Sequence, residues 1–311
     1  MASLSRRVFF GGCAAAPSLL AQSSLAQSSP VRSGNATLSR QIANLLDRFE
    51  GKLWLYAKNL DTGAEFGLRP DERVRTASTI KLPILCALFD LVGAGKVRWD
   101  EKLTLREADK ISGSGVLHEF FDGTQLAVRD VAHVMIVVSD NTATNLILDR
   151  ITADAVNDYL DRIGLRSTRA LRKVRGDGAD LKPPSGLSKA SLLPENKPYG
   201  LGVTTPREMV TLLEMIERGK IVSPEASREI VAILKRQQYK DGIGRRRGDD
   251  VASKSGSLDA LRSDVGIVYL PTSRLAIAAT VDDMPKVDYS PDNAGEILIA
   301  DVTERLVAEL G

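Results

Sequence analysis

The sequence predicts an α+β fold in which an antiparallel sheet, built from both chain ends and flanked by helices, carries an inserted all-helical lobe. Segments with a strand pattern cluster at the two ends of the 311-residue chain, whereas residues 78–235 have a mostly helical pattern. We therefore expect residues 38–77 and 236–311 to form the sheet lobe together. The junction of the two lobes is the expected place for an active-site cleft.

The first residues resemble an export address rather than part of the fold. Arg6 and Arg7 begin a stretch similar to a twin-arginine signal, and a small-residue cleavage pattern ends at Ala26. We expect residues 1–26 to be a signal peptide and residues 27–37 to be a flexible segment. The mature protein is then expected in the periplasm or outside the cell, without stable membrane insertion, because no apolar segment reaches the length of a spanning helix.

The individual helices and strands follow from the spacing of apolar residues. A helical period predicts helices over residues 38–49 and 293–310. Segments of strand-forming residues bounded by turn residues are expected to be strands: residues 52–57, 64–68, 264–270 and 275–282. In the helical region, stretches rich in Gly, Ser and Pro predict breaks at residues 112–115 and 176–202.

The composition argues against several classes of partner. Forty-two Lys and Arg face 40 Asp and Glu, so the chain lacks the basic excess of a nucleic-acid binder or a polybasic membrane-surface protein. Without the signal only Cys86 remains, so no disulfide can form within the chain, and its apolar neighbours predict burial. His118, expected in a surface loop, and His133, expected to pack on a helix, make no metal-ligand pattern. We expect a monomer with no metal and no cofactor.

Three short motifs occur in order along the chain: Ser78-Thr79-Ile80-Lys81, Ser139-Asp140-Asn141 and Lys254-Ser255-Gly256. Each is weak alone, since a Ser followed three residues later by a Lys occurs by chance about once in a chain of this length. The three together are much rarer. Their residue types fit nucleophilic catalysis by a serine.

Ser78 is the expected nucleophile. It opens a helical segment, so its hydroxyl and backbone N–H are expected at a helix N-terminus, where developing negative charge is favoured. Lys81 lies one turn later on the same face, and a buried Lys beside another cation can lose its proton and activate a serine. Lys254 would supply that second positive charge and bind a substrate carboxylate. Further cations for this carboxylate, without a ranking, are Lys240, Arg245 and Arg262.

The other motif residues suit proton transfer and substrate binding. Ser139 can relay a proton to the departing nitrogen, and Asn141 can bind a substrate amide with both its donor and its acceptor. Gly256 lets the backbone between Ser255 and Ser257 approach the substrate closely. The N–H groups of Ser257 and Ser78 would form the oxyanion hole.

With these motifs, the chain resembles the class A serine β-lactamases, within the superfamily of β-lactamases and penicillin-binding proteins. The resemblance covers nearly the whole mature chain, and further segments that carry it are residues 69–72, 76–78, 122–124, 203–206 and 264–268. It implies a β-lactamase/transpeptidase-like fold over residues 38–311. It also implies that Ser78 attacks the β-lactam carbonyl and forms an acyl-enzyme.

One departure from the family concerns the second half of the reaction. Class A enzymes carry a Glu on the Ω loop that holds the deacylating water, and the position that aligns with it here is Val174. The nearest alternative base is Glu195, which lies further along the same segment. The resemblance therefore implies slow deacylation, unless Glu195 reaches the site.

Three functions remain open on the sequence alone. The first is a β-lactamase-type hydrolase, and the second is a D,D-peptidase that acts on cell-wall peptides through the same motifs. The third is a non-hydrolytic binder of a β-lactam or of a peptidoglycan fragment. The intact set of Ser78, Lys81 and Ser139 argues against a loss of chemistry.

Overall fold

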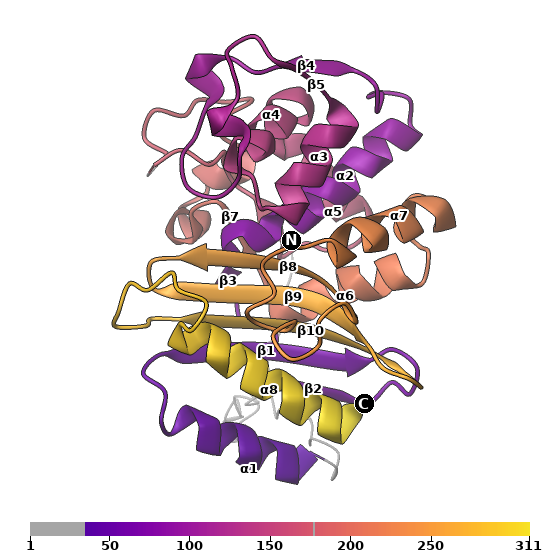
Figure 1. The fold of residues 1–311 in the computed structure, drawn as a ribbon, viewed down its shortest axis with the longest axis vertical. Helices are drawn as coiled ribbons and strands as arrows, with labels where there is room; N and C mark the ends of the chain where they lie inside the picture. Colours follow the sequence, from indigo (N-terminus) through magenta and orange to yellow (C-terminus); the bar gives the residue numbers. More distant parts are fainter. Residues whose placement is uncertain (1–34, 177) are drawn as a thin grey trace, which may run out of the picture. The chain divides into compact units, whose positions relative to one another are not determined.

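The computed structural model describes residues 35–176 and 178–311 (Figure 1). The expected signal peptide and most of the expected flexible segment lie outside these described residues. Helix α1 (Asn35–Leu46) begins before residue 38, so the last residues of that segment are helical. Its buried residues Leu38 and Ile42 lie one turn apart, as an amphipathic helix requires. No helix in the described part of the chain is long and apolar enough to cross a membrane.

An antiparallel sheet joins the two ends of the chain. Its five strands lie in the order β2-β1-β10-β9-β8. Strands β1 and β10 are neighbours, with Lys52 opposite Asp282 and Asn59 opposite Leu275. This pairing confirms the predicted α+β class with a sheet from both ends. The bounds are β1 Lys52–Asn59, β2 Glu65–Leu68, β8 Val251–Leu258, β9 Leu261–Tyr269 and β10 Arg274–Asp282.

Helices cover both faces of the sheet (Figure 1). Helices α1 and α8 (Ala294–Leu310) pack together over one face, where Leu53 and Leu55 of β1 belong to their core. Helices α6 (Pro206–Glu217) and α7 (Pro224–Lys235) contact the sheet as well, and Tyr56 belongs to the core on that side. Because alternate residues of a strand point to opposite faces, β1 contributes to both cores.

The inserted region is built around helix α2. All of its residues from Lys81 to Phe89 are buried, including Cys86, which is fully buried as predicted. The helices of this region are α2 Lys81–Gly93, α3 Val128–Val137, α4 Asn141–Ile151 and α5 Ala153–Arg162. Short strands accompany them: β3 Val74–Arg75, β4 Lys102–Thr104, β5 Gln125–Ala127, β6 Arg169–Ala170 and β7 Gly202–Thr204. The 3₁₀ helices are η1 Ala77–Ile80, η2 Glu107–Asp109, η3 Leu117–Glu119, η4 Lys189–Leu192 and η5 Pro194–Tyr199.

Two asparagine side chains attach β6 and the segment that follows it to the helices. Asn157 of α5 donates to the carbonyl of Ala170 at 2.9 Å and accepts its N–H at 2.8 Å. Asn145 of α4 makes the same pair of hydrogen bonds with Val174, at 2.8 and 2.9 Å. The backbone of Val174 is thus fixed beside α4, one turn after the Ser-Asp-Asn motif.

Candidate active site

Ser78 lies on the 3₁₀ turn η1, immediately before α2. The preceding residue, Ala77, has a φ of 46°, a left-handed conformation that is unfavourable for a residue with a side chain. This turn exposes Ser78 to a cavity of about 530 Å³. The predicted site residues that line this cavity are Ser78, Ser139, Asn141, Ser255 and Ser257. The structure thus brings the three motifs to one place.

Lys81 is fully buried behind this cavity. Its Nζ donates to the carbonyl of Ser139 at 2.6 Å, to the Ser139 hydroxyl at 3.2 Å and to Oδ1 of Asn141 at 3.0 Å. Burial lowers the pKa of Lys81 well below its usual value, and the charge of Lys254 lowers it further, while Asp140 opposes the shift. A neutral amine in contact with a hydroxyl can accept and return a proton.

Asp140 holds the turn that carries the second motif. Its buried carboxylate caps the start of α4 and also accepts the N–H groups of Val116 and Leu117, at 2.6 and 2.8 Å. A Cβ on Gly115, whose φ is +109°, would lie 2.3 Å from this carboxylate, so the loop can pass only with glycine there. The neighbouring Ser139 has a φ of 52°. Asp140, which received no role from the sequence, therefore fixes a strained turn against the cavity.

Strand β8 runs directly against the Ser78 turn. It is the edge strand of the sheet, so only one of its sides pairs with β9. A Cβ at Gly256 would lie 2.7 Å from the backbone nitrogen of Ser78 and 2.9 Å from that of Thr79. Only glycine permits this approach. The backbone of β8, with Ser257 next in sequence, thus meets the Ser78 N–H where the oxyanion hole was predicted.

Lys254 is also fully buried, but its surroundings are different. Its Nζ donates to the carbonyl of Ser255 at 2.7 Å. Burial lowers the pKa of Lys254 to about 7, although the charge of Asp264 on β9 acts in the opposite direction. Burial in turn raises the pKa of Asp264 to about 6. We expected Lys254 to be fully charged at neutral pH, whereas this burial leaves it near its midpoint.

The other candidate cations are occupied by protein partners. Lys240 pairs with Asp249 at 2.6 Å, and Arg245 pairs with Asp292. Arg262 lines the cavity, but its guanidinium is buried and donates to backbone carbonyls. Lys254 is also fully buried and does not itself line the cavity, but its Nζ contacts Ser255, which does, so we retain it as the cation for a substrate carboxylate.

The structure does not bring Glu195 to the cavity. This residue is exposed on η5, and its backbone carbonyl accepts a hydrogen bond from Arg73 at 3.4 Å. Val174 lies closer to the motif turn through its bonds with Asn145, but it offers only an aliphatic side chain. Among the described residues of the segment 166–202, no acidic side chain lines the cavity.

The histidines lie elsewhere. His118 pairs with Glu119 through Nε2 at 3.2 Å, and Nδ1 of His133 lies 2.9 Å from the carbonyl of Arg129 on α3. Neither lines the cavity with Ser78. Within the described ranges, no group of three or more His, Cys, Asp or Glu residues is arranged to hold a metal ion.

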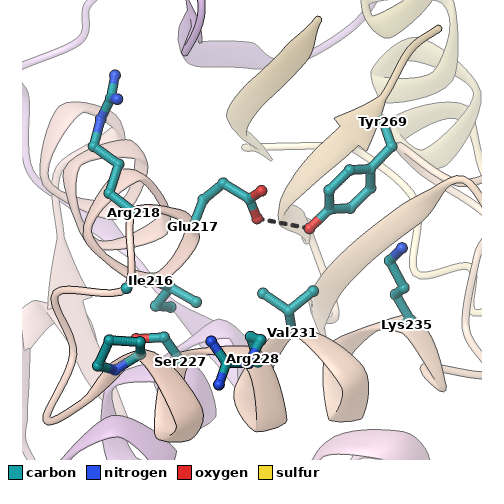
Figure 2. Close-up of a pocket in the computed structure, with 10 residues that line it drawn as sticks. Ile216, Glu217, Arg218, Ser227, Arg228, Val231, Lys235 and Tyr269 are labelled. Atoms are coloured by element: carbon teal, nitrogen blue, oxygen red, sulfur yellow. Dashed lines mark hydrogen bonds between the residues drawn. The ribbon is translucent and has the colours of Figure 1, made fainter.

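A second cavity, of about 390 Å³, lies where the end of α6 and helix α7 meet the end of β9 (Figure 2). Its clearest polar contact joins the hydroxyl of Tyr269 to the carboxylate of Glu217 at 2.8 Å. That carboxylate also pairs with Arg274 at 3.1 Å. The residues of the three motifs do not line this cavity, so it is not the candidate site.

Two acidic residues in the Ser78 cavity were missed by the sequence analysis. Asp241 comes from the loop after α7, and Glu296 comes from the first turn of α8. Glu296 precedes the buried Ile299 by three residues, so helical spacing could have placed it on the inner face. Nothing local marks Asp241, because the cavity forms only when distant segments meet.

The fold and this serine-lysine cleft define a protein of the β-lactamase/transpeptidase-like class. Residues 37–310 match the β-lactamase enzyme family, and the chain belongs to that family. A β-lactamase from Bacillus licheniformis is 24% identical over 86% of this chain and 82% of the relative. The β-lactamase regulatory protein BlaB from Streptomyces cacaoi is 26% identical over 80% of this chain and 89% of the relative.

Solved structures of β-lactamases and of PBP-A are similar to this chain as well. The β-lactamase from Sphaerobacter thermophilus is 31% identical, with a TM-score of 0.75 over 88% of this chain and 97% of that one. PBP-A is 30% identical, with a TM-score of 0.72 over 88% of this chain and 95% of that one.

Proposed function

We propose that this protein opens the amide bond of β-lactams through an acyl-enzyme on Ser78. The observation that carries the proposal is the meeting of β8 with the Ser78 turn, next to a buried lysine whose pKa is strongly lowered. A similar protein supports it: a point mutant of PBP-A, 29% identical with a TM-score of 0.72, is described as an acyl-enzyme complex with penicillin G.

Acylation follows from the positions of the cavity residues. Lys81 accepts the proton of the Ser78 hydroxyl, whose oxygen then attacks the β-lactam carbonyl. The carbonyl oxygen takes up negative charge against the N–H groups of Ser78 and Ser257. When the C–N bond breaks, the nitrogen needs a proton, and the Ser139 hydroxyl, 3.2 Å from the Lys81 amine, can deliver it.

Deacylation is expected to be the slow step. Hydrolysis of the Ser78 ester requires a positioned water and a base, and general-base assistance is typically worth about 10²–10⁴-fold. The position that aligns with the family's Glu holds Val174, and Glu195 is exposed outside the cavity. We therefore propose rapid formation of the acyl-enzyme followed by slow release.

A D,D-peptidase activity on cell-wall peptides is the second candidate, and the same missing carboxylate favours it. Both reactions use Ser78, Lys81 and Ser139, and an enzyme that passes its acyl group to another acceptor does not need an efficient hydrolytic base. Non-hydrolytic binding is less well supported, because the nucleophile and its lysine are intact.

We further propose that the protein acts as a monomer after export by the twin-arginine route, in the periplasm or outside the cell. The sequence around Arg6 and Arg7 supports the export step. Fractionation of cells that produce the full chain, compared with a variant in which both arginines are lysines, tests this point. Accumulation of the variant in the cytoplasm is the expected result, and equal export of both proteins would contradict it.

Hydrolysis of a chromogenic cephalosporin tests the proposed reaction. We expect a burst equal to about one equivalent of enzyme, followed by a slow steady rate. Ser78→Ala should abolish both phases, whereas the control Ser290→Ala, in the same cavity but outside the three motifs, should keep the burst. A complete absence of turnover and burst would overturn the proposal, and release of D-alanine from a peptide would then favour the peptidase.

A further inference from the structure

Three charged side chains line the Ser78 cavity: Asp241, Glu296 and Arg262. All three come from the sheet side of the cleft, since they belong to the loop after α7, to α8 and to β9. A substrate bound at Ser78 shares this cavity with them. The charges that these side chains offer to a ligand therefore influence which substituents the substrate can carry.

Arg262 is not available to an anionic group. The residue is 1% exposed, and its guanidinium donates to the carbonyls of Leu258 and Leu261, each at 2.6 Å, and to that of Asp288. These bonds tie the turn between β8 and β9 to the loop before α8. A substrate carboxylate could use this cation only by breaking them, so the positive charge is already satisfied by backbone dipoles.

The carboxylate of Glu296, in contrast, accepts no hydrogen bond from the described residues, although the residue is only 8% exposed. It forms one ion pair, with Nε of Arg262 at 3.8 Å, which is beyond hydrogen-bond length. The half-buried carboxylate of Asp241 has neither a hydrogen bond nor an ion pair within the described ranges. Because neither carboxylate accepts a hydrogen bond from the described residues, both keep acceptor capacity for a donor or a cation bound in the cavity.

Aromatic rings also line this part of the cavity. Tyr239 is 42% exposed and Tyr289 is 61% exposed, although large apolar side chains are normally covered. The Arg262 guanidinium lies 4.8 Å from the centre of the Tyr289 ring, so this ring already attracts one cation. Ring faces of tyrosine bind ammonium and pyridinium groups by the same attraction.

We propose that Asp241 and Glu296, with the rings of Tyr239 and Tyr289, form a subsite for a positively charged substituent of the substrate. The matching substrate class is a β-lactam that carries a quaternary ammonium or pyridinium group in addition to its carboxylate. The inference rests on the proposed function, because it takes the Ser78 cavity as the substrate site. It assigns the carboxylate to Lys254 and the cation to the two acids.

The protonation of Glu296 adds a pH dependence to this preference. Burial and the charge of Asp264 raise the pKa of Glu296 to about 8, Asp241 acts in the same sense, and Arg262 and Arg245 oppose the shift. Near neutral pH Glu296 therefore holds a proton in the empty cavity. It becomes charged as the pH rises above about 8, or when a bound cation favours the carboxylate.

Two cephalosporins with the same acyl side chain and nucleus test the inference. One carries a neutral acetoxymethyl group at C3 and the other a pyridiniummethyl group, and each is reacted with the full-length protein. The quantity measured is the ratio of their second-order rate constants for acylation of Ser78. Comparison of this ratio between wild type and variants cancels the intrinsic difference in reactivity.

We expect Asp241→Asn to lower the preference for the pyridinium compound roughly fivefold, with the rate for the neutral compound nearly unchanged. Glu296→Gln should lower it by a similar factor at pH 9 and by less at pH 6. The matched control is Asp249→Asn, because Asp249 is a fully exposed carboxylate on the same loop that lies outside the cavity.

The outcomes separate the subsite from the reaction. If both compounds acylate Ser78 and neither Asp241→Asn nor Glu296→Gln changes the ratio, the subsite is wrong and the proposed reaction stands. If neither compound acylates Ser78 in the wild type, the proposed function fails instead. An equal loss for both compounds in Asp241→Asn would also overturn the subsite, since it would show a general effect on the fold.

Discussion

Each side of the Ser78 cleft holds a fully buried lysine, but the two amines are placed in different ways. We call the side formed by α2 and the Ser139–Asn141 turn the helical wall, and the side formed by β8, β9, α8 and the loop after α7 the sheet wall. Nζ of Lys81 has three oxygen partners, all from Ser139 and Asn141, between 2.6 and 3.2 Å. Nζ of Lys254 has the carbonyl of Ser255 at 2.7 Å. Burial and a neighbouring cation keep the pKa of Lys81 well below its usual value, whereas Asp264 limits the fall for Lys254 to about 7. The helical wall thus supplies a proton acceptor and the sheet wall a titrating positive charge.

The cavity-lining carboxylates, unlike the two lysines, all lie on one wall. The acids that line the cavity among the described residues, Asp241 and Glu296, belong to the sheet wall. Val174, which the sequence resemblance aligns with the family's Glu, carries no acid and does not line the cavity. The side of the cleft that holds Lys81 therefore has no acid in the cavity, and for the proposed reaction we expect acylation and deacylation to respond to different substitutions.

Removal of the proton acceptor should have the largest effect. Lys81→Met is expected to slow acylation by about 10²–10⁴-fold with little change in initial binding, because it removes the amine proposed to accept the Ser78 proton and to pass it to the Ser139 hydroxyl. Stopped-flow measurements at several substrate concentrations separate the acylation rate constant from the dissociation constant of initial binding. Lys235→Met, in the second cavity, is the control. Equal acylation rates for wild type and Lys81→Met would contradict the role of Lys81 as the proton acceptor.

Adding an acid to the helical wall should supply what that wall lacks. Val174→Glu is expected to speed deacylation by about 10–10²-fold and leave acylation nearly unchanged, because the backbone of residue 174 is already fixed by Asn145. Val174→Gln, with the same shape and no charge, serves as the control. The decay of the acyl-enzyme, followed by mass spectrometry, gives the rate. No gain over the control would show that deacylation is limited elsewhere.

We expect Lys254, on the sheet wall, to determine the pH dependence of acylation. The pKa of Lys254 is lowered to about 7, so its charged form is present below pH 7 and is lost as the pH rises through that value. For a substrate with a carboxylate, the second-order acylation constant is then expected to fall up to about tenfold per pH unit above 7. Lys254→Arg, which stays charged, should remove this limb. A limb that persists in Lys254→Arg would assign it to another group.

The buried acid of the sheet wall should affect stability by a smaller amount. The unfolded chain releases the proton of Glu296 near pH 4.5, whereas the folded protein keeps it up to about pH 8, so the free energy of unfolding falls with rising pH between these values. Glu296→Gln should reduce this fall by roughly 1–3 kcal/mol in urea titrations at pH 5 and pH 8. Glu309→Gln, at an exposed position of the same helix, should not. Identical pH profiles for Glu296→Gln and wild type would contradict a raised pKa for this buried acid.

Much of this arrangement could be predicted from local sequence. The strand patterns at the chain ends predicted the sheet in which β1 pairs with β10, and the motif spacing predicted the meeting of Ser78 and Lys81 with Ser139. These predictions worked because period and spacing determine which residues share a face. Gly256 carried its own signal, since a glycine inside a strand indicates a close backbone approach.

The rest depended on tertiary contacts that no local pattern records. Arg262 was expected to be a helper for the substrate carboxylate, but carbonyls of two loops surround its guanidinium. Asp241 and Glu296 reach the cavity only because the loop after α7 and helix α8 meet there. Glu195 was a candidate base by sequence position, yet the path of its loop leaves it exposed. Side-chain partners across distant segments are decided by packing, not by spacing.

The decisive experiment for the acyl-enzyme is the mass of the intact protein after brief exposure to penicillin G. We expect the wild type to gain the mass of one penicillin, the adduct to persist through the measurement, and peptide mapping to locate it on Ser78. Ser78→Ala should gain no mass under the same conditions. A label on another residue, or labelling that survives Ser78→Ala, would contradict the assignment of the nucleophile and the acyl-enzyme built on it.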